Sequence, residues 1–130
     1  MSSIFTKIIQ GEMPCYKLAE TEEFLAFLDI APLSKGHALV VPKRETDYIF
    51  DIESHEYGRL WQFAKRLANA QKKIVSCQRI GIAVVGLEVP HAHIHLIPLN
   101  AVEDINFSKS KLSLNPEEMN EIAQSIAEIF

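Results

Sequence analysis

The sequence predicts an α+β fold in which an antiparallel sheet of about five strands carries helices on one face. Short runs rich in β-branched and aromatic residues follow one another like hairpin strands, first near the N-terminus and again after the midpoint of the chain. Between them, a long segment places apolar residues at the 3.6-residue period of a helix. Hairpins followed by a helix and two more strands favour an antiparallel sheet.

The first elements are a short helix and a hairpin. Residues 4–10 have apolar side chains at helical spacing, with Ser3 as the predicted N-cap and Gly11 ending the helix. Two extended segments follow at residues 16–20 and 24–29, and the polar residues between them predict a turn.

The central elements are predicted from the same two signals, β-rich composition and apolar periodicity. Residues 37–42 read as a strand that ends at a proline. Residues 54–75 form the longest predicted helix, with Ser54 as its cap. Residues 79–86 and 92–99 read as inner strands.

A C-terminal helix is predicted from Asn115 onward. Asn115 is a suitable N-cap, Pro116 suits the first helical position, and Glu118 completes a capping box. The preceding residues, 103–114, show no periodicity and are predicted to be a surface connection.

Composition limits the class of protein. The chain has 130 residues, which fit one domain spanning 1–130, and its 48% apolar and 23% charged residues are ordinary globular values. A net charge of −4 with scattered Lys and Arg argues against nucleic-acid binding, although it does not exclude a single nucleotide. No membrane span or signal peptide is evident, so a cytoplasmic protein is expected. Cys15 and Cys77 are predicted to be reduced thiols.

Three of the five histidines alternate with apolar residues at 91, 93 and 95. Alternate side chains of a strand share a face, so the three imidazoles would lie together, opposite a packed face. Packing alone explains such a pattern poorly. Imidazole is mostly neutral at pH 7 yet more basic than a carboxylate, so it suits nucleophilic attack on phosphorus, with neighbouring imidazoles orienting it and donating a proton.

A metal site is the chemical alternative, because histidines at i and i+2 on one strand can reach a common zinc ion. His91 and His95 would lie about 13 Å apart on a strand that rises about 3.3 Å per residue, too far to chelate one ion together easily. A metal would therefore need His37, Asp29 or a water as a further ligand.

The run resembles the signature of the histidine-triad (HIT) nucleotide hydrolases, His-φ-His-φ-His-φ-φ with φ apolar, which stands here at residues 91–97. Further blocks resemble this family in the same order: residues 4–9, 11–14, 27–32 and 36–43. The resemblance implies a HIT-like antiparallel sheet of about five strands with a long central helix, a short N-terminal helix and a C-terminal helix.

The same resemblance implies a role for each histidine. His93 would attack the α-phosphorus of a purine nucleotide and form a nucleotidyl-histidine intermediate, which water then hydrolyses. His95 would contact the phosphate and the leaving group, and His91 would orient His93. His37 matches an additional buried histidine of the family that joins the proton network; without the resemblance it could equally be an ordinary strand-end residue.

The resemblance also implies how a nucleotide is held. Asp29 would accept hydrogen bonds from the ribose hydroxyls, and backbone atoms of Gly86 and Val89 would line the phosphate. Five apolar residues would enclose the base: Ile4, Phe5, Ile8, Phe27 and Ile30. Taken alone, Asp29 would be a turn residue and the apolar set ordinary core.

Two departures from the family bear on function. Leu87 and Glu88 follow Gly86 where the family usually has Gly-Gln and a small polar residue, which puts an apolar group and a carboxylate beside the expected phosphate. Ser3 and Thr6 occupy the region of the cysteine ligands found in the family's zinc-containing branch. No metal and no other cofactor is therefore expected.

The sequence thus predicts a metal-independent enzyme that releases a nucleoside monophosphate from a purine nucleoside phosphoramidate, an aminoacyl adenylate or a dinucleoside polyphosphate. Two alternatives stay open: a nucleotide-binding or regulatory protein with little turnover because of Leu87 and Glu88, and a metalloprotein. The family pairs as homodimers through the long helix and a continued sheet. A homodimer is expected here, with Trp61 or Phe63 either at its interface or in the core.

Overall fold

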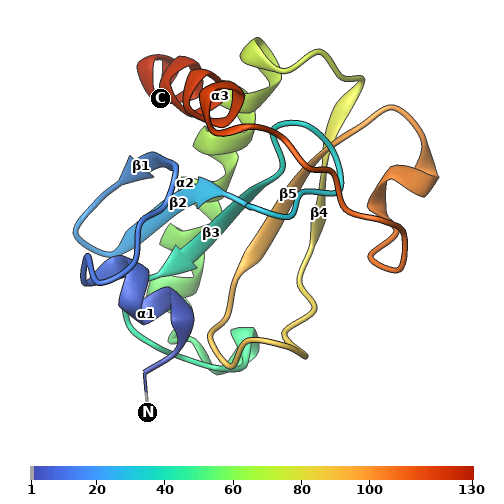
Figure 1. The fold of residues 1–130 in the computed structure, drawn as a ribbon. Coiled ribbons are helices and arrows are strands. Elements are labelled where there is room, and N and C mark those ends of the chain that lie inside the picture. The colour runs from blue at the N-terminus through green and yellow to red at the C-terminus, as the bar shows by residue number, and fades with distance from the viewer. Residues whose placement is uncertain (1) are drawn as a thin grey trace.

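The computed structural model describes residues 2–130 and has the predicted five-stranded antiparallel sheet, in the order β1-β2-β3-β5-β4 (Figure 1). The elements in chain order are α1 (Ile4–Ile9), β1 (Lys17–Glu20), β2 (Phe24–Leu28), β3 (Ala38–Pro42), the 3₁₀ helix η1 (Ile49–Asp51), α2 (Ser54–Ile74), β4 (Arg79–Ala83), β5 (Ile94–Leu99), the 3₁₀ helix η2 (Val102–Ile105) and α3 (Pro116–Ile129). The predicted α+β class is confirmed, and both β1 and β4 are edge strands.

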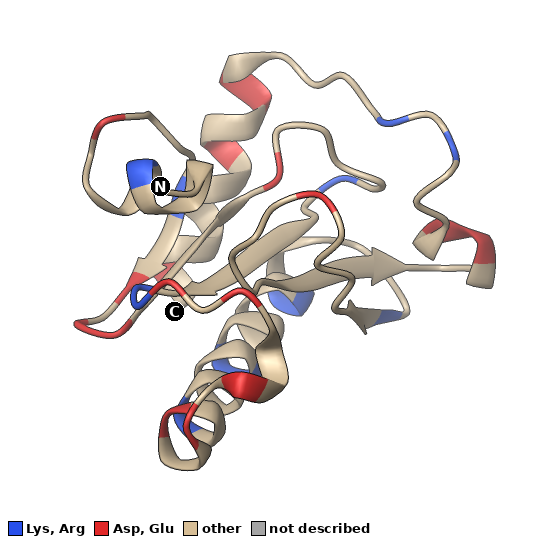
Figure 2. Cartoon of the chain, turned by 90° about the horizontal axis from the view of Figure 1, so that it is seen from below, with Lys and Arg blue, Asp and Glu red and all other residues tan. Residues whose placement is uncertain are grey.

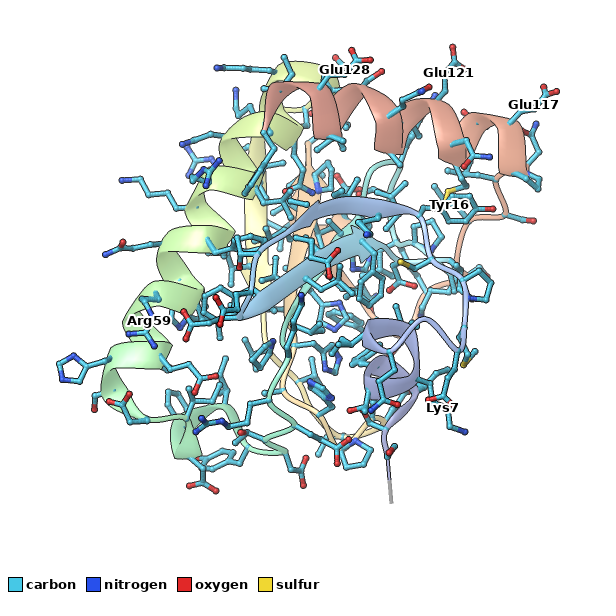
Figure 3. All side chains as sticks on the ribbon, turned by 90° about the vertical axis from the view of Figure 1, so that its left-hand side faces the viewer. Lys7, Tyr16, Arg59, Glu117, Glu121 and Glu128 are labelled. Carbon is cyan, nitrogen blue, oxygen red and sulfur yellow. The ribbon has the colours of Figure 1, made fainter. Side chains whose placement is uncertain are left out.

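Two helices, α2 and α3, cover one face of the sheet and form the main core with it. Figure 3 shows Glu117, Glu121 and Glu128 pointing away from that core on the outer side of α3. The side of α3 that is buried against the sheet is apolar: Met119, Ile122, Ala123 and Ile126. None of the helices in residues 2–130 is both long and apolar enough to cross a membrane.

The expectation that all helices lie on one face is wrong for α1. Strands β2 and β3 are buried on both faces, so their second apolar face also needs a cover. Phe5 of α1 covers part of this second face. It packs against the strand residues Leu25, Phe27, Leu39 and Val41. As predicted, Ser3 caps α1, its hydroxyl accepting from the backbone N–H of Thr6.

Several predicted element ends differ from the structure. Glu53, not Ser54, caps α2, because its carboxylate accepts hydrogen bonds from the backbone N–H groups of His55 and Glu56 in the first turn. The predicted cap of α3 is confirmed, since the Asn115 side chain accepts from the backbone N–H of Glu118.

The prediction of two inner strands is wrong for β4, which lies at the edge of the sheet because it pairs with β5 alone, and both strands are shorter than predicted. β4 ends at Ala83 rather than at Gly86, and β5 begins at Ile94 rather than at Ala92. Gly86 takes a positive φ of 72°, and the backbone N–H of Ala92 donates to Thr46 outside the sheet. Residues 84–93 therefore form a loop that leads into β5.

Gly36 sets the path of the chain into β3. Its φ is +89°, and a Cβ added there would lie 2.5 Å from Cγ2 of Val75. We expect Gly36→Ala to lower the free energy of unfolding by at least about 2 kcal/mol, since it combines an unfavourable φ with overpacking.

Gly58 of α2 is the matched control for Gly36. A Cβ there would meet nothing within 4 Å, so Gly58→Ala should raise the free energy of unfolding by about 0.5–1 kcal/mol through helix propensity. Urea denaturation of both variants measures the two effects, and changes of the same sign would contradict this account of Gly36.

Candidate active site

A cavity of about 430 Å³ lies where α1, the end of β2 and the loop after β4 meet. Every residue predicted for catalysis or nucleotide binding lines this cavity, with the exception of His91. Its apolar wall contains the residues expected around a base, Ile4, Phe5, Ile8, Phe27 and Ile30. The cavity therefore brings together side chains from distant parts of the chain.

The hydrogen bond of His93 defines which ring nitrogen is free. Its Nδ1 lies 2.8 Å from the backbone oxygen of His91. A carbonyl oxygen can only accept, so Nδ1 carries the proton and Nε2 keeps its lone pair. The edge of the Phe5 ring packs against the His93 ring at a centroid distance of 4.9 Å and limits its rotation. His93 thus has the tautomer that a nucleophile requires.

A second chain of hydrogen bonds orients His95. The backbone N–H of Leu33 donates to Nδ1 of His37 over 3.0 Å, so His37 carries its proton on Nε2. That Nε2–H donates to Nδ1 of His95, also over 3.0 Å. His95 must then carry its own proton on Nε2. These hydrogen bonds all run from Leu33 through His37 to His95, and they leave His95 with a hydrogen-bond donor at Nε2.

Burial keeps these two rings neutral. The pKa of His37 is lowered to about 3, mainly by burial and in addition by the neighbouring His95. The pKa of His95 is lowered to about 4, again mainly by burial. Neither ring carries a charge at pH 7. Burial also raises the pKa of Asp29, whose Oδ2 lies 3.7 Å from Nε2 of His37.

His91 lies behind the cavity. The strand geometry expected for all three histidines does not hold, because β5 begins only at Ile94. The His91 ring is fully buried, and its Nε2–H donates to the backbone oxygen of Pro42 over 2.7 Å. His91 nevertheless reaches His93, through its backbone carbonyl rather than its side chain.

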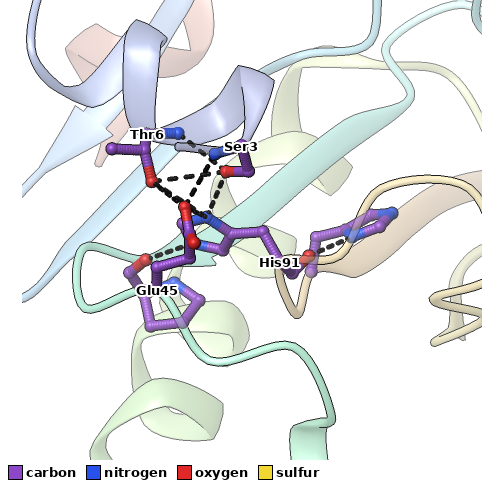
Figure 4. Close-up of polar contacts among 6 residues, drawn as sticks. Ser3, Thr6, Glu45 and His91 are labelled. Atoms are coloured by element: carbon purple, nitrogen blue, oxygen red, sulfur yellow. Dashed lines mark hydrogen bonds and ion pairs between the residues drawn. The ribbon is translucent and has the colours of Figure 1, made fainter. Parts of the chain in front are cut away.

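A network of polar groups holds His91 against the start of α1 (Figure 4). The Ser3 hydroxyl donates to Nδ1 of His91 over 2.7 Å, because Nε2 already carries the ring proton. Oε1 of Glu45 accepts from the Ser3 backbone N–H over 2.7 Å and from the Thr6 hydroxyl over 2.6 Å. Serine and threonine are not usual zinc ligands, and these hydroxyls are already committed to protein partners.

One group of side chains has a spacing that suits a metal. Ligand atoms of Asp29, His37 and His95 lie within 4.8 Å of one another. The two imidazole nitrogens involved are, however, bonded to each other through the His37 proton. A metal ion there would have to replace that proton and turn both lone pairs toward itself.

Among the cavity-lining residues that sequence reasoning missed are Phe107 and Lys111. Both lie in the connection between η2 and α3, where Figure 2 shows basic residues. Phe107 packs edge-on against His95 at a centroid distance of 4.8 Å. The backbone N–H of Leu112 donates to Pro32 and holds the connection beside the Asp29 loop. No local pattern marked this segment, because only a long-range contact brings it to the site.

Known proteins resemble this chain in sequence and in structure. The HIT domain family model matches residues 10–102. The chain is 35% identical over 130 residues to an adenosine 5′-monophosphoramidase of Schizosaccharomyces pombe, covering 98% of this chain and 97% of the relative. It is 36% identical over 132 residues to an uncharacterized HIT-like protein of Borreliella burgdorferi, covering 95% of each. The crystal structure of a HIT-like protein from Bartonella henselae aligns with a TM-score of 0.84 at 25% identity, over 99% of this chain and 97% of that one.

Proposed function

This chain belongs to the HIT family, and we propose that it hydrolyses purine nucleotides at the α-phosphate through a nucleotidyl-histidine intermediate. The substrate would be a nucleoside phosphoramidate, an aminoacyl adenylate or a dinucleoside polyphosphate. The observation that carries the proposal is the pair of tautomers at the cavity. His93 presents a free Nε2 lone pair, and His95 beside it carries a proton on Nε2.

In the first step, Nε2 of His93 attacks the α-phosphorus and forms a P–N bond. The bond to the leaving group breaks, and the leaving group departs with the electron pair. The His93 ring becomes positively charged, and its Nδ1–H bond to the His91 carbonyl stabilises that charge. In the second step, water attacks the phosphorus and loses a proton to solvent, the P–N bond breaks, and the nucleoside monophosphate leaves as the electron pair returns to Nε2 of His93.

His95 would act on the phosphate and on the leaving group. As a neutral ring bonded through Nδ1 to His37, it can donate only from Nε2. Such a donor stabilises the negative charge that develops on a phosphoryl oxygen and on the departing group by hydrogen bonding, and the departing group takes its proton from solvent. The protein groups thus provide a nucleophile and a hydrogen-bond donor for this route.

The nucleotide would lie with its base in the apolar part of the cavity. Asp29 would accept hydrogen bonds from the ribose hydroxyls, and its Oδ1 already accepts from the backbone N–H of Ala31, which orients the carboxylate. Gly86 and Val89 would approach the phosphate through the loop after β4.

Single-turnover hydrolysis of α-³²P-labelled adenosine 5′-phosphoramidate in EDTA tests the proposal. We expect release of labelled AMP, and a labelled protein that survives base but loses its label in acid, as a P–N bond to histidine does. Activity that EDTA abolishes and zinc restores would favour the metalloprotein instead. Binding of AMP without any turnover would favour a nucleotide-binding protein, with Leu87 and Glu88, which line the cavity, as the suspected cause.

We propose in addition that the chain forms a homodimer through β4. This strand is an edge of the sheet, and Ile82, Val84 and Val85 on it and just after it are exposed. Trp61 is half-buried and lines a second hollow that reaches Val84 and Val85, whereas Phe63 belongs to the core. An apolar edge strand of this kind favours pairing with a second strand.

Val84→Asp should convert the dimer to a monomer, because it places a charge in the centre of this apolar edge. Size-exclusion chromatography with light scattering measures the change. Ile129→Asp is the control, since Ile129 is a comparably exposed apolar residue at the other end of the chain, on α3. A monomeric wild-type protein would refute the proposal.

A further inference from the structure

Glu45 lies outside the cavity and has no place in the reaction described above. It follows β3 in the chain, and its side chain is about one-third exposed (35%). Its Oε1 nevertheless accepts two hydrogen bonds from the start of α1, from the Ser3 backbone N–H and from the Thr6 hydroxyl. Both bonds are short, at 2.7 and 2.6 Å, as expected for donors to a carboxylate.

The helix that Glu45 holds is a wall of the cavity. α1 has six residues, too few to be a stable helix by itself, so its position depends on tertiary contacts. Ile4, Phe5 and Ile8 of α1 line the cavity, and Phe5 packs against His93. Movement of α1 would therefore disturb both the base-binding wall and the ring of the nucleophile.

The same corner also holds His91. Ser3, whose backbone is bound by Glu45, donates its hydroxyl proton to Nδ1 of His91. With Nε2 bonded to Pro42, both nitrogens of His91 have partners, and its carbonyl is fixed as the acceptor for His93. A continuous path of contacts leads from Glu45 through Ser3 and His91 to the ring of His93.

We infer that Glu45 is a positioning residue that fixes α1 and His91 together, and thereby sets both nucleotide affinity and the orientation of His93. The inference rests on the proposed function for nucleotide affinity and for the rate, whereas the orientation of His91 and His93 does not depend on it. Oε1 acts as a double hydrogen-bond acceptor. A glutamine, whose amide oxygen can accept the same two bonds, should therefore replace Glu45 with little loss.

The experiment compares Glu45→Ala, Glu45→Gln and the control Glu12→Ala, which removes a carboxylate from the loop after α1. Glu45→Ala should weaken AMP binding in calorimetry and slow single-turnover release by about 5–10-fold each, as expected when two hydrogen bonds are lost. Glu45→Gln and Glu12→Ala should stay within about 2-fold of the wild type.

Nitrogen NMR of the histidine rings provides a readout that does not depend on turnover. In the wild type, His91 should show a protonated Nε2 and His93 a protonated Nδ1, and Glu45→Ala should change both signals toward mixed tautomers. Unchanged tautomers and AMP affinity in Glu45→Ala would overturn the inference. So would a glutamine variant as impaired as the alanine variant, because charge rather than hydrogen-bond acceptance would then matter. A wild type without turnover would refute the proposed function, while the NMR comparison would still test Glu45.

Discussion

His93→Ala is expected to lower single-turnover release of AMP by at least about 10⁴-fold, because it removes the atom that would form the proposed covalent intermediate. No other imidazole can take over. His91 has both nitrogens bonded and lies outside the cavity, and the lone pair of His95 is occupied by the proton of His37. Release from an adenosine 5′-phosphoramidate carrying a fluorescent amine, measured in EDTA, tests this expectation.

AMP affinity should change far less than the rate in this variant, since most of the cavity wall is apolar and remains intact. His55→Ala is the matched control, because His55 is exposed at the start of α2, and its rate should equal that of the wild type. A His93→Ala protein that keeps a rate within about 10-fold of the wild type would exclude His93 as the nucleophile.

Lowering the pH from 7 to 5 is expected to reduce the free energy of unfolding by about 4 kcal/mol through His37 and His95 together. The folded state keeps both rings neutral, with pKa values lowered to about 3 and about 4, whereas in the unfolded chain each ring takes up a proton near its ordinary pKa of 6.5. This stability is fully present above pH 6.5 and decreases as the pH falls toward 4 and 3. Burial lowers the pKa of His91 as well and acts in the same direction, while the raised pKa of Asp29 acts in the opposite one.

Urea denaturation at pH 7, 6 and 5 measures this dependence. His37→Asn removes one of the two titrating rings, so its loss between pH 7 and 5 should be smaller than that of the wild type by about 2 kcal/mol. His55→Ala, which changes an exposed ring, should retain the full loss. Equal losses in His37→Asn and the wild type would show that the protons are taken up elsewhere.

Local patterns were sufficient for most of the architecture. Apolar periodicity identified α2 and α3, and capping residues identified the starts of α1 and α3, because these signals depend on neighbours within one turn of helix. The alternation at residues 91–95 led to the proposed chemistry, and the family resemblance connected it with Asp29, His37 and the apolar residues of α1. The structure brings these residues to one cavity.

The sequence by itself therefore determined the α+β class, the order of the elements and the residues to be considered for the site. Only the tertiary structure decided three things: the position of α1 on the second face of the sheet, the proton-bearing nitrogen of the four buried histidines, and the placement of Glu45, Phe107 and Lys111. The physical reason is the same for each. A tautomer or a helix position depends on partners such as the oxygen of Pro42 or the N–H of Leu33, which long-range packing alone brings within hydrogen-bond distance.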